Sequence, residues 1–405
     1  MELERENRHW EDGFAYPYEK QRSIFPELER SAKSGLITAV YGLRRVGKST
    51  LLRQLINSQL AKGVKRESIF LYSFDEQVDD FWQIIAEYEK VSQKPIGKGS
   101  SIYLDEIQNV PDWQAKVKKL YDTSKARIVL SGSNSALLRK SGEGLAGRIN
   151  EFFLPELSFS EFLDFQSKKV SPLASSGRER LYLEYIRKPF PETALNDTID
   201  AKAYADTIAR KVIFEDLPQV FPIDEPALLY RLFSIICANP GMVLDYSSLA
   251  SDLGRDRKTL SAYSDFLVYG FLVARLYNYS TNRLSSEKKL KKVYPSLACF
   301  AKSETSKIIE NAVAQALKPR FFWNYKNRAE VDFIVDEPFF AFEVKYKVTP
   351  SADDFRGIKQ FRQAYPKAKA VLVAKSEGNG AIAYYNLDSY LKKNKIMPGG
   401  GFGPL

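Results

Sequence analysis

The chain has 405 residues, of which 44% are apolar and 27% are charged, and it carries a net charge of +10. This ordinary globular balance excludes wholesale disorder and fibrous repeats, and at about 150 residues per domain the length predicts two or three domains. The excess of basic residues favours a polyanionic partner such as nucleic acid, the alternative being a merely soluble basic surface.

Rare residue types narrow the chemistry further. The single histidine, His9, excludes serine–histidine and cysteine–histidine nucleophilic schemes. Cys237 and Cys299 are too few for a disulfide framework or a structural zinc site. No apolar run approaches the roughly 18 residues of a membrane span, and the acidic first residues do not resemble an export signal. We therefore expect a cytoplasmic chain without membrane contact, whose chemistry depends on carboxylates, lysine, backbone amides and a hard cation.

Strand-like and helical patterns alternate from Gly35 onward. Residues 36–41 form an apolar, partly β-branched run that is typical of a buried parallel strand. Apolar residues at helical spacing then predict a helix over 51–60. Further strands are expected at 69–74, 101–104, 127–130 and 149–154. Strands that alternate with helices predict an α/β fold, in which helices cover both faces of a parallel sheet.

A phosphate-binding loop lies between the first of these strands and the helix. Residues 42–49 match the pattern G-x-x-x-x-G-K-[ST], and an ordinary glycine turn is the alternative interpretation. In such a loop the backbone amides and the helix N-terminus face the phosphates, the lysine reaches the β- and γ-phosphates, and the serine hydroxyl ligates Mg²⁺. We therefore predict ATP and Mg²⁺ as cofactors. The predicted nucleotide contacts are Gly42, Arg44, Arg45, Val46, Gly47, Lys48, Ser49 and Thr50.

Two acidic residues follow the strand that is expected at 101–104. Asp105 is placed to hold Mg²⁺ through water, together with Ser49, and Glu106 to polarise the attacking water as a general base. An acidic strand end is common by itself. Beside a phosphate loop, the pair favours ATP hydrolysis, with Lys48 and Glu106 as catalytic residues, over passive nucleotide binding.

Polar residues also follow the next two strands. Ser133 and Asn134 are candidates for sensing the γ-phosphate. Arg148 is a candidate for stabilising transition-state charge, either in cis or in trans from a neighbouring subunit of a homo-oligomer, and an ordinary surface arginine is the alternative.

These motifs together resemble a prokaryotic AAA-type ATPase family whose members carry a C-terminal domain of unknown function. The resemblance covers about residues 20–300. It implies an additional-strand P-loop core, with the acidic strand between others, and a winged-helix module. Relatives often show a glycine pair near residues 187–192, where this chain has Arg-Lys-Pro-Phe-Pro-Glu. The shared motifs are Tyr41–Ser49, Tyr103–Gln108, Leu130–Ser133, Leu145–Arg148 and Leu157–Leu163.

The pattern over residues 239–272 is helix, turn, helix, followed by a strand, and is similar to a winged-helix module. Basic residues lie near the start of the second helix and in the wing that follows, suited to phosphate or base contacts on DNA. A packing module with a solvated charged face is the alternative. The predicted DNA-contacting residues are Arg255, Arg257, Lys258, Lys288, Lys289, Lys291 and Lys292.

The C-terminal region carries an ordered set of acidic residues. Glu310 lies on a predicted helix, Asp332 on a strand, and Glu343 and Lys345 on one face of the next strand. If the strands pair as a hairpin, the three acids can hold a divalent cation while Lys345 orients or deprotonates water. The order resembles the PD-(D/E)xK nuclease superfamily, except that Val331 replaces the usual proline. A retained fold without cleavage is the alternative.

The sequence thus predicts an AAA-type P-loop NTPase sheet, a winged-helix module and a restriction-endonuclease-like α/β domain. The expected function is a Mg²⁺-dependent ATPase that binds, remodels or processes DNA, including branched DNA. One alternative is an ATP-controlled signalling or defence switch with a non-catalytic partner-binding domain, and another is a metal-dependent nuclease regulated by ATP. The predicted domains are residues 1–165 for the ATPase core with its N-terminal lead-in, 166–225 for a helical lid or linker, 226–300 for the winged-helix module, 301–392 for the nuclease-like domain and 393–405 for a flexible tail.

Overall fold

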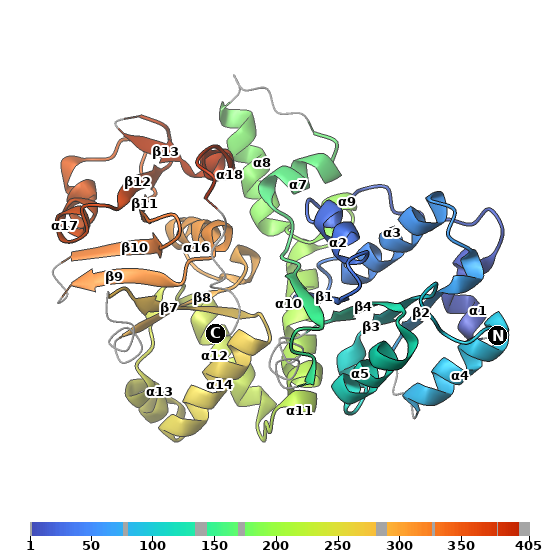
Figure 1. Ribbon diagram of the computed structural model, residues 1–405. Coiled ribbons are helices and arrows are strands. Elements are labelled where there is room, and N and C mark those ends of the chain that lie inside the picture. The colour runs from blue at the N-terminus through green and yellow to red at the C-terminus, as the bar shows by residue number, and fades with distance from the viewer. Residues whose placement is uncertain are drawn as a thin grey trace. The chain divides into compact units, whose positions relative to one another are not determined.

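A computed structural model of the chain describes residues 2–75, 80–133, 144–168, 175–280, 290–325, 329–378 and 380–396 (Figure 1). The chain divides into two compact units, unit 1 at Met1–Leu157 and unit 2 at Ser158–Leu405. Most of the predicted flexible tail, residues 397–405, lies outside the described residues. Within the described residues, no helix combines the length and the hydropathy needed to cross a membrane.

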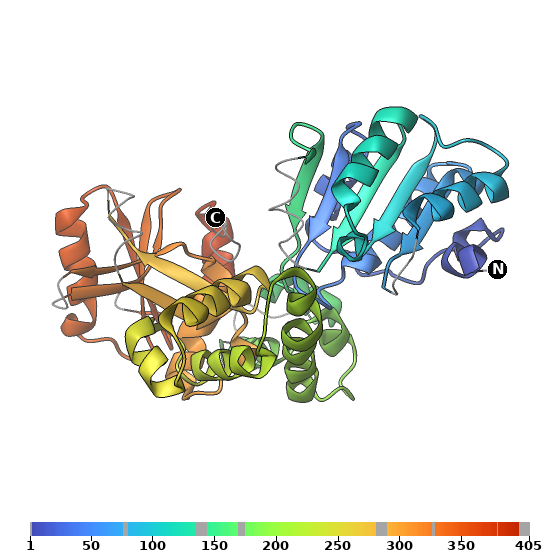
Figure 2. The same cartoon turned by 90° about the horizontal axis from the view of Figure 1, so that it is seen from below.

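Unit 1 is built on a five-stranded parallel sheet with the order β2-β3-β4-β1-β5 (Figure 2). The predicted strands are confirmed, and so is the position of the acidic strand β3 between two others. Because all five strands are parallel, the loops that follow them gather at one edge of the sheet. The strands are β1 at Ile37–Tyr41, β2 at Ile69–Ser73, β3 at Ser101–Asp105, β4 at Arg127–Gly132 and β5 at Ile149–Phe153.

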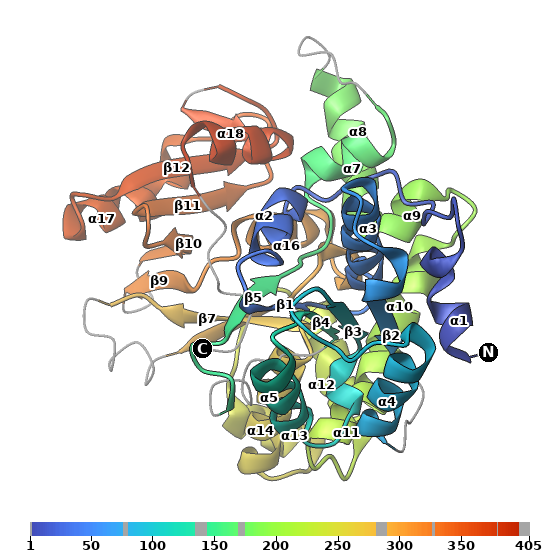
Figure 3. The same cartoon turned by 45° about the vertical axis from the view of Figure 1, so that its right-hand side comes forward.

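Helices cover both faces of this sheet (Figures 1 and 3). On one face α3 buries Leu51, Leu52, Leu55 and Ile56, the residues at helical spacing that predicted it. On the other face α4 and α5 pack against inward-facing residues of β2, β3 and β4 in one apolar cluster. The helices of this unit are α1 at Glu2–Glu6, α2 at Phe25–Ser31, α3 at Lys48–Ala61, α4 at Phe81–Ser92 and α5 at Trp113–Ser124, with short 3-10 turns η1 at Arg8–Trp10, η2 at Arg66–Ser68 and η3 at Ile107–Asn109.

Unit 2 contains an eight-stranded mixed sheet with the order β13-β12-β11-β10-β9-β7-β8-β6. Strands of the predicted winged-helix module and of the predicted nuclease-like domain join in this sheet, because β7 pairs with β9 in parallel. The sequence patterns did not reveal that the two modules share one sheet. The strands are β6 at Met242–Val243, β7 at Val273–Asn278, β8 at Lys291–Pro295, β9 at Phe321–Tyr325, β10 at Ala329–Val335, β11 at Phe340–Lys345, β12 at Lys369–Ala374 and β13 at Ala381–Ala383.

The helices of unit 2 precede this sheet and fill its connections. The helix–turn–helix pattern is present as α13 and α14, which follow N-caps at Asp245 and Asp256 whose carboxylates accept backbone amides. The helices are α7 at Phe159–Phe165, α8 at Ser175–Arg187, α9 at Pro191–Leu195, α10 at Ala201–Lys211, a π-helical turn η4 at Val212–Asp216, α11 at Leu217–Val220, α12 at Pro226–Ala238, α13 at Tyr246–Leu253, α14 at Arg257–Tyr269, α16 at Thr305–Leu317, α17 at Arg356–Ala364 and α18 at Leu387–Lys393, with 3-10 turns η5 at Ala298–Phe300, η6 at Ala352–Phe355 and η7 at Tyr384–Asn386.

Candidate nucleotide-binding site

The phosphate loop connects the end of β1 to the start of α3, as its sequence pattern predicts. Gly47 caps α3 with a left-handed backbone, φ 100°, which favours glycine. A Cβ atom on Gly42 would lie far inside van der Waals contact with the carbonyl oxygen of Leu154, the residue after β5. The loop therefore needs its two glycines for different reasons, one for backbone conformation and the other for close packing against the neighbouring chain segment.

A buried arginine fixes this loop from outside. Arg22 donates from one guanidinium nitrogen to the carbonyl of Val46 at 2.8 Å, and from another to the carbonyls of Pro155 and Glu156 at 2.9 and 2.8 Å. The sequence analysis missed Arg22, which lies before the first strand and belongs to no recognised motif. The Arg22 guanidinium links the phosphate loop to the segment that follows β5, so we expect the phosphate loop to be rigid.

Lys48 places its ammonium group over the phosphate loop. Its Nζ donates to the carbonyls of Gly42 at 3.2 Å and Leu43 at 3.1 Å, and to the hydroxyl of Ser133 at 2.9 Å. The same nitrogen lies 3.9 Å from Oε1 of Glu106. One buried cation thus contacts the loop, the end of β4 and the acid that follows β3.

Asp105, the last residue of β3, is buried at the bottom of this site. The hydroxyl of Ser131 donates to its carboxylate, and the hydroxyl of Ser49 also interacts with it. Burial and the neighbouring Glu106 carboxylate raise the pKa of Asp105 above its ordinary value. A carboxylate and a hydroxyl that meet in this way offer the oxygen donors that Mg²⁺ prefers.

Glu106 is held by three different groups. The hydroxyl of Ser133 donates to its Oε1 at 2.6 Å, and Nε2 of Gln108 donates to its Oε2 at 2.6 Å. Burial by itself would raise the pKa of Glu106, but the Lys48 charge and these two hydrogen bonds outweigh it and lower the pKa below its ordinary value. Glu106 is therefore an ionised, oriented carboxylate. Gln108 belongs to the quoted motif Tyr103–Gln108, but no sequence pattern assigned it a role.

The structure places the other residues predicted to contact the nucleotide in different environments. Arg44 lies close enough to Glu106 to contribute to its lowered pKa, and Thr50 lies half-buried on α3. Arg45 adopts a left-handed backbone, φ 67°, within the loop. Asn134 lies outside the described residues.

Arg148 corrects one prediction. It directly precedes β5, and its carbonyl accepts from the amide of Ile37 at the start of β1, whereas the phosphate loop follows the other end of β1. Its Nε pairs with Asp122 at 3.2 Å. Because the strand of about 17 Å lies between them, Arg148 does not reach the phosphate loop of its own chain. Its role in trans stays a prediction.

The acidic residues predicted for the C-terminal region lie on α16, β10 and β11 of unit 2. Strands β10 and β11 pair antiparallel, so Asp332 and Glu343 lie on a hairpin. Burial raises the pKa of both residues, and each is raised further by a neighbouring acid. Lys345 pairs with Glu343 at 2.6 Å, and Oε2 of Glu343 is buried with no hydrogen-bond partner in the described part of the chain.

Glu310, in contrast, is already occupied by other groups. It accepts the hydroxyl of Tyr294 at 2.8 Å and pairs with Lys307 at 2.8 Å. Among the residues that the structure describes, no three acids, histidines or cysteines are grouped so that they could hold a metal ion. The predicted ligand set of Glu310, Asp332 and Glu343 is therefore corrected: the structure does not gather all three as one metal site.

The predicted DNA-contacting residues have different environments in the structure. Arg257 and Lys258 are exposed at the start of α14, while the exposed Arg255 pairs with Glu225 through two nitrogens at 3.0 and 2.7 Å. Lys291 is half-buried, with its ammonium 5.2 Å from the ring of Tyr277.

Lys292 corrects another prediction. It is buried and pairs with Glu330 on β10, so it belongs to the interior of the sheet and not to a basic wing. Lys288 and Lys289 lie outside the described residues.

Comparisons with known proteins match three successive parts of the chain. The profile of the AAA domain matches residues 34–163, and profiles of two domains of unknown function match residues 179–301 and 305–388. An uncharacterized protein of Haemophilus influenzae is 29% identical over 64% of this chain and 66% of its own length, just under two thirds. An uncharacterized protein of Methanocaldococcus jannaschii is 27% identical over 78% of this chain and 76% of its own.

Solved structures show only a distant likeness. A replication initiator DnaA bound to AMPPCP and single-stranded DNA has a TM-score of 0.32 at 14% identity, covering 63% of this chain and 92% of that one. The S. cerevisiae Hsp104–ADP complex has a TM-score of 0.34 at 13% identity, covering 64% and 39%. The sequence matches and the parallel sheet thus make the first part of the chain similar to an AAA domain, and the two following parts similar to two domains of unknown function.

Proposed function

We propose that this protein is a Mg²⁺-dependent ATPase. The observation that supports this function best is the set of contacts made by Lys48. Its ammonium touches the carbonyls of the phosphate loop, the Ser133 hydroxyl and, at 3.9 Å, the Glu106 carboxylate. The cation that would contact the phosphates therefore lies next to the carboxylate that would accept a proton from the attacking water.

The phosphate loop and its surroundings would bind the triphosphate of ATP. Backbone amides of the loop and of the first turn of α3 supply hydrogen-bond donors, and Lys48 supplies a positive charge for the β- and γ-phosphates. Ser49 and Asp105 would hold Mg²⁺, which when bound neutralises charge on the phosphate oxygens. The raised pKa of Asp105 reflects burial beside a second acid, a position that suits a cation ligand.

Glu106 would accept a proton from the attacking water. In this step the water oxygen bonds to the γ-phosphorus, the bond to the β–γ bridging oxygen breaks, and ADP leaves. A lowered pKa keeps the carboxylate ionised, and hydrogen bonds from Ser133 and Gln108 fix its direction. Ser133 bridges Lys48 and Glu106 and would couple the position of the acid to that of the phosphate.

Two substitutions test this proposal. Lys48→Ala should abolish tight ATP binding and turnover, because it removes the cation over the loop. Glu106→Gln keeps the size and the hydrogen-bonding pattern and removes the base, so ATP binding should persist while turnover falls by about 100-fold or more. Nucleotide binding by calorimetry and phosphate release separate the two effects. Wild-type turnover in Glu106→Gln would contradict the role of this acid.

We further propose that ATP hydrolysis is coupled to binding, remodelling or processing of DNA, branched DNA included. Support comes from the net charge of +10 and from Arg257 and Lys258, exposed in the first turn of α14. Backbone contacts to phosphates from a helix start are common in DNA-binding modules of this shape. The rival function, an ATP-controlled signalling or defence switch, requires no DNA.

The test for DNA compares single-stranded, duplex and branched DNA as activators of ATP turnover at low salt. We expect stimulation that falls steeply with added salt and that is lost in Lys258→Glu. Lys202→Glu is a matched control, because Lys202 is also exposed at the second position of a helix after an aspartate N-cap. A flat response to all three forms of DNA would favour the switch.

A metal-dependent nuclease is a second candidate activity, with Asp332 and Glu343, but not Glu310, as its metal ligands. Oε2 of Glu343 is buried without a hydrogen-bond partner among the described residues, and the residue lines a pocket of about 540 Å³ together with Lys345. With Mg²⁺ or Mn²⁺ the wild type should nick supercoiled plasmid, while Asp332→Ala and Glu343→Gln should not. Equal cutting by wild type and both variants would indicate a contaminant and exclude this site.

A further inference from the structure

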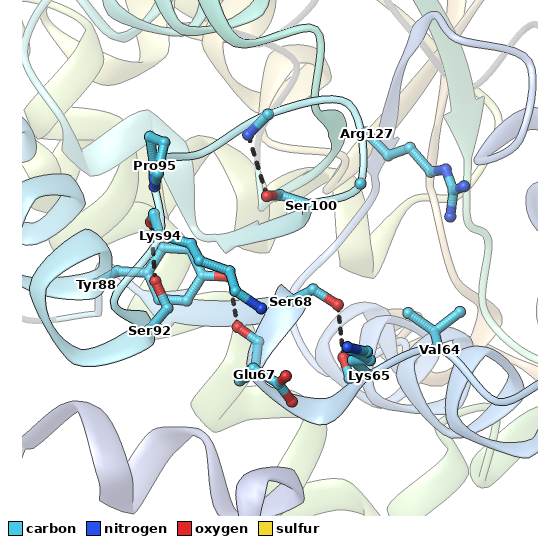
Figure 4. A pocket seen from close by; sticks show the side chains of 12 residues that line it. Val64, Lys65, Glu67, Ser68, Tyr88, Ser92, Lys94, Pro95, Ser100 and Arg127 are labelled. Atoms are coloured by element: carbon cyan, nitrogen blue, oxygen red, sulfur yellow. Dashed lines mark hydrogen bonds between the residues drawn. The ribbon is translucent and has the colours of Figure 1, made fainter.

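Unit 1 also contains a pocket at the edge of the sheet where the strands begin, opposite the phosphate loop. Figure 4 shows the residues that line it. The pocket has a volume of about 480 Å³ and lies between residues 64–68, which lead into β2, and residues 88–100, which lead into β3. Arg127, the first residue of β4, completes it. The phosphate loop follows the carboxyl end of β1, so a strand length of about 17 Å separates the two sites.

The pocket gathers more positive than negative charge among the residues that the structure describes. Lys65, Lys94 and Arg127 line it, against the single carboxylate of Glu67 among its lining residues. In the described part of the chain, no ion pair joins any of these three cations to an acid, whereas nearby Lys62 pairs with Glu29. Uncompensated cations around one cavity create a local positive potential that favours an anionic ligand.

Hydrogen bonds fix the walls of the pocket (Figure 4). The hydroxyl of Ser68 donates to the carbonyl of Lys65 at 2.6 Å, and that of Ser92 to the carbonyl of Lys94 at 3.1 Å. The ring of Tyr88 is buried and stacks against the core, 4.4 Å from the ring of Phe70. The backbone segments that carry Lys65 and Lys94 are therefore already ordered, which lowers the entropic cost of binding a ligand.

We propose that this pocket binds a phosphate-bearing ligand, at a site separate from the phosphate loop. An arginine fork can pair with two oxygens of one phosphate group, and the two lysines that also line the pocket add positive charge. The volume falls within the range of small-molecule sites, about 300–1,000 Å³, so a free phosphorylated compound or the phosphorylated end of a nucleic-acid strand can enter. The proposal does not depend on ATP hydrolysis.

The experiment uses the full-length protein, with the phosphate loop filled by saturating Mg²⁺ and a non-hydrolysable ATP analogue. Pyrophosphate is titrated by calorimetry, and a short 5′-phosphorylated oligothymidylate by fluorescence anisotropy. We expect at least one probe to bind, and Arg127→Ala to weaken that binding about tenfold or more. Binding of pyrophosphate would indicate a small phosphorylated ligand, and binding of the oligonucleotide alone a strand end.

Two further variants make the result decisive. Glu67→Gln removes the carboxylate at the pocket, so it should tighten binding about threefold, a gain that damage to the fold would not produce. Lys119→Ala is the control: Lys119 is an exposed lysine of the same unit outside the pocket, and its loss should leave affinity unchanged. The proposal is overturned if neither probe binds the wild type, or if Arg127→Ala and Glu67→Gln both bind as the wild type does.

Discussion

Gly42 offers the sharpest test of how the phosphate loop is built. A methyl group at this position would meet the carbonyl oxygen of Leu154 well inside 3.0 Å and its carbonyl carbon at 3.2 Å. The backbone of Leu154 cannot move aside easily, because its amide donates to the carbonyl of Tyr41 at 2.7 Å and Arg22 holds the next two carbonyls. Gly42→Ala must therefore push the loop away from the strand it packs against.

The expected cost follows from this contact. Overpacking against fixed backbone costs about 1–3 kcal/mol, which for a unit of this size lowers Tm by about 2–4 °C per kcal/mol. Because the displaced atoms carry the phosphate-binding amides, we also expect ATP affinity to fall about tenfold or more. Thermal unfolding and calorimetric titration with ATP measure the two effects separately.

Gly63→Ala is the matched control. Gly63 has a positive φ of 79°, as Gly42 has one of 156°, but a methyl group on Gly63 would meet nothing within 4 Å. It should cost about 1 kcal/mol of backbone strain and leave ATP affinity unchanged. Equal ATP affinity in the wild type and in Gly42→Ala would refute the idea that close packing against Leu154 shapes the site.

Three further predictions concern ionisable groups. The lowered pKa of Glu106 predicts that its own protonation limits turnover only below the ordinary glutamate range, and Gln108→Leu, which removes one hydrogen bond to Glu106, should move this acid limit of the pH–rate profile upward. An unchanged limit would contradict the role of Gln108. Burial lowers the pKa of His9 from 6.5 to about 4. The neutral form fits the fold above pH 6.5, and the free energy of unfolding should fall by about 3 kcal/mol as the pH drops from 6.5 to 4. His9→Gln should remove this slope from pH-dependent unfolding, and a persistent slope would exclude His9 as its source. A double-mutant cycle of Lys292→Met and Glu330→Gln should give a coupling free energy of about 1–2 kcal/mol. This is less than for a fully buried ion pair, because the Glu330 side chain is 40% exposed. Additive effects of the two substitutions would mean that the ion pair contributes nothing to stability.

The nucleotide site was largely predictable because its chemistry depends on short spacings. The phosphate loop, Asp105 and Glu106 each follow a strand whose apolar run is visible in the sequence, and parallel pairing brings the strand ends together. Arg22 was not predictable in this way. Its partners lie up to 134 positions further along the chain, and no local pattern distinguishes an arginine that holds a loop from one on the surface.

The two corrections, to the role of Arg148 in cis and to Lys292 as part of a basic wing, have a common physical origin. Arg148 and Lys292 were assigned by their neighbours in the sequence, but their positions are set by strand pairing. Arg148 precedes a strand that runs parallel to β1, which places it at the wrong edge for its own phosphate loop. Lys292 lies on β8 of the same sheet, where its buried side chain reaches Glu330 on β10 and the ring of Phe322 on β9. Charge and spacing identify a residue type suited to a role, whereas register decides which edge or face receives it.

The junction between β7 and β9 explains why the regions matched by two separate profiles form one sheet. The backbone pairing itself is short, and the side chain of Asn278 extends it. Its Oδ1 accepts the amide of Asn324 and its Nδ2 donates to the carbonyl of the same residue, both at 3.0 Å. One side-chain amide thus replaces a missing pair of ladder hydrogen bonds, at a position that is buried in the folded chain. Deleting residues 305–405 would remove β9 and with it both hydrogen-bond partners of the Asn278 side chain. The two regions are therefore expected to unfold together and not as independent domains.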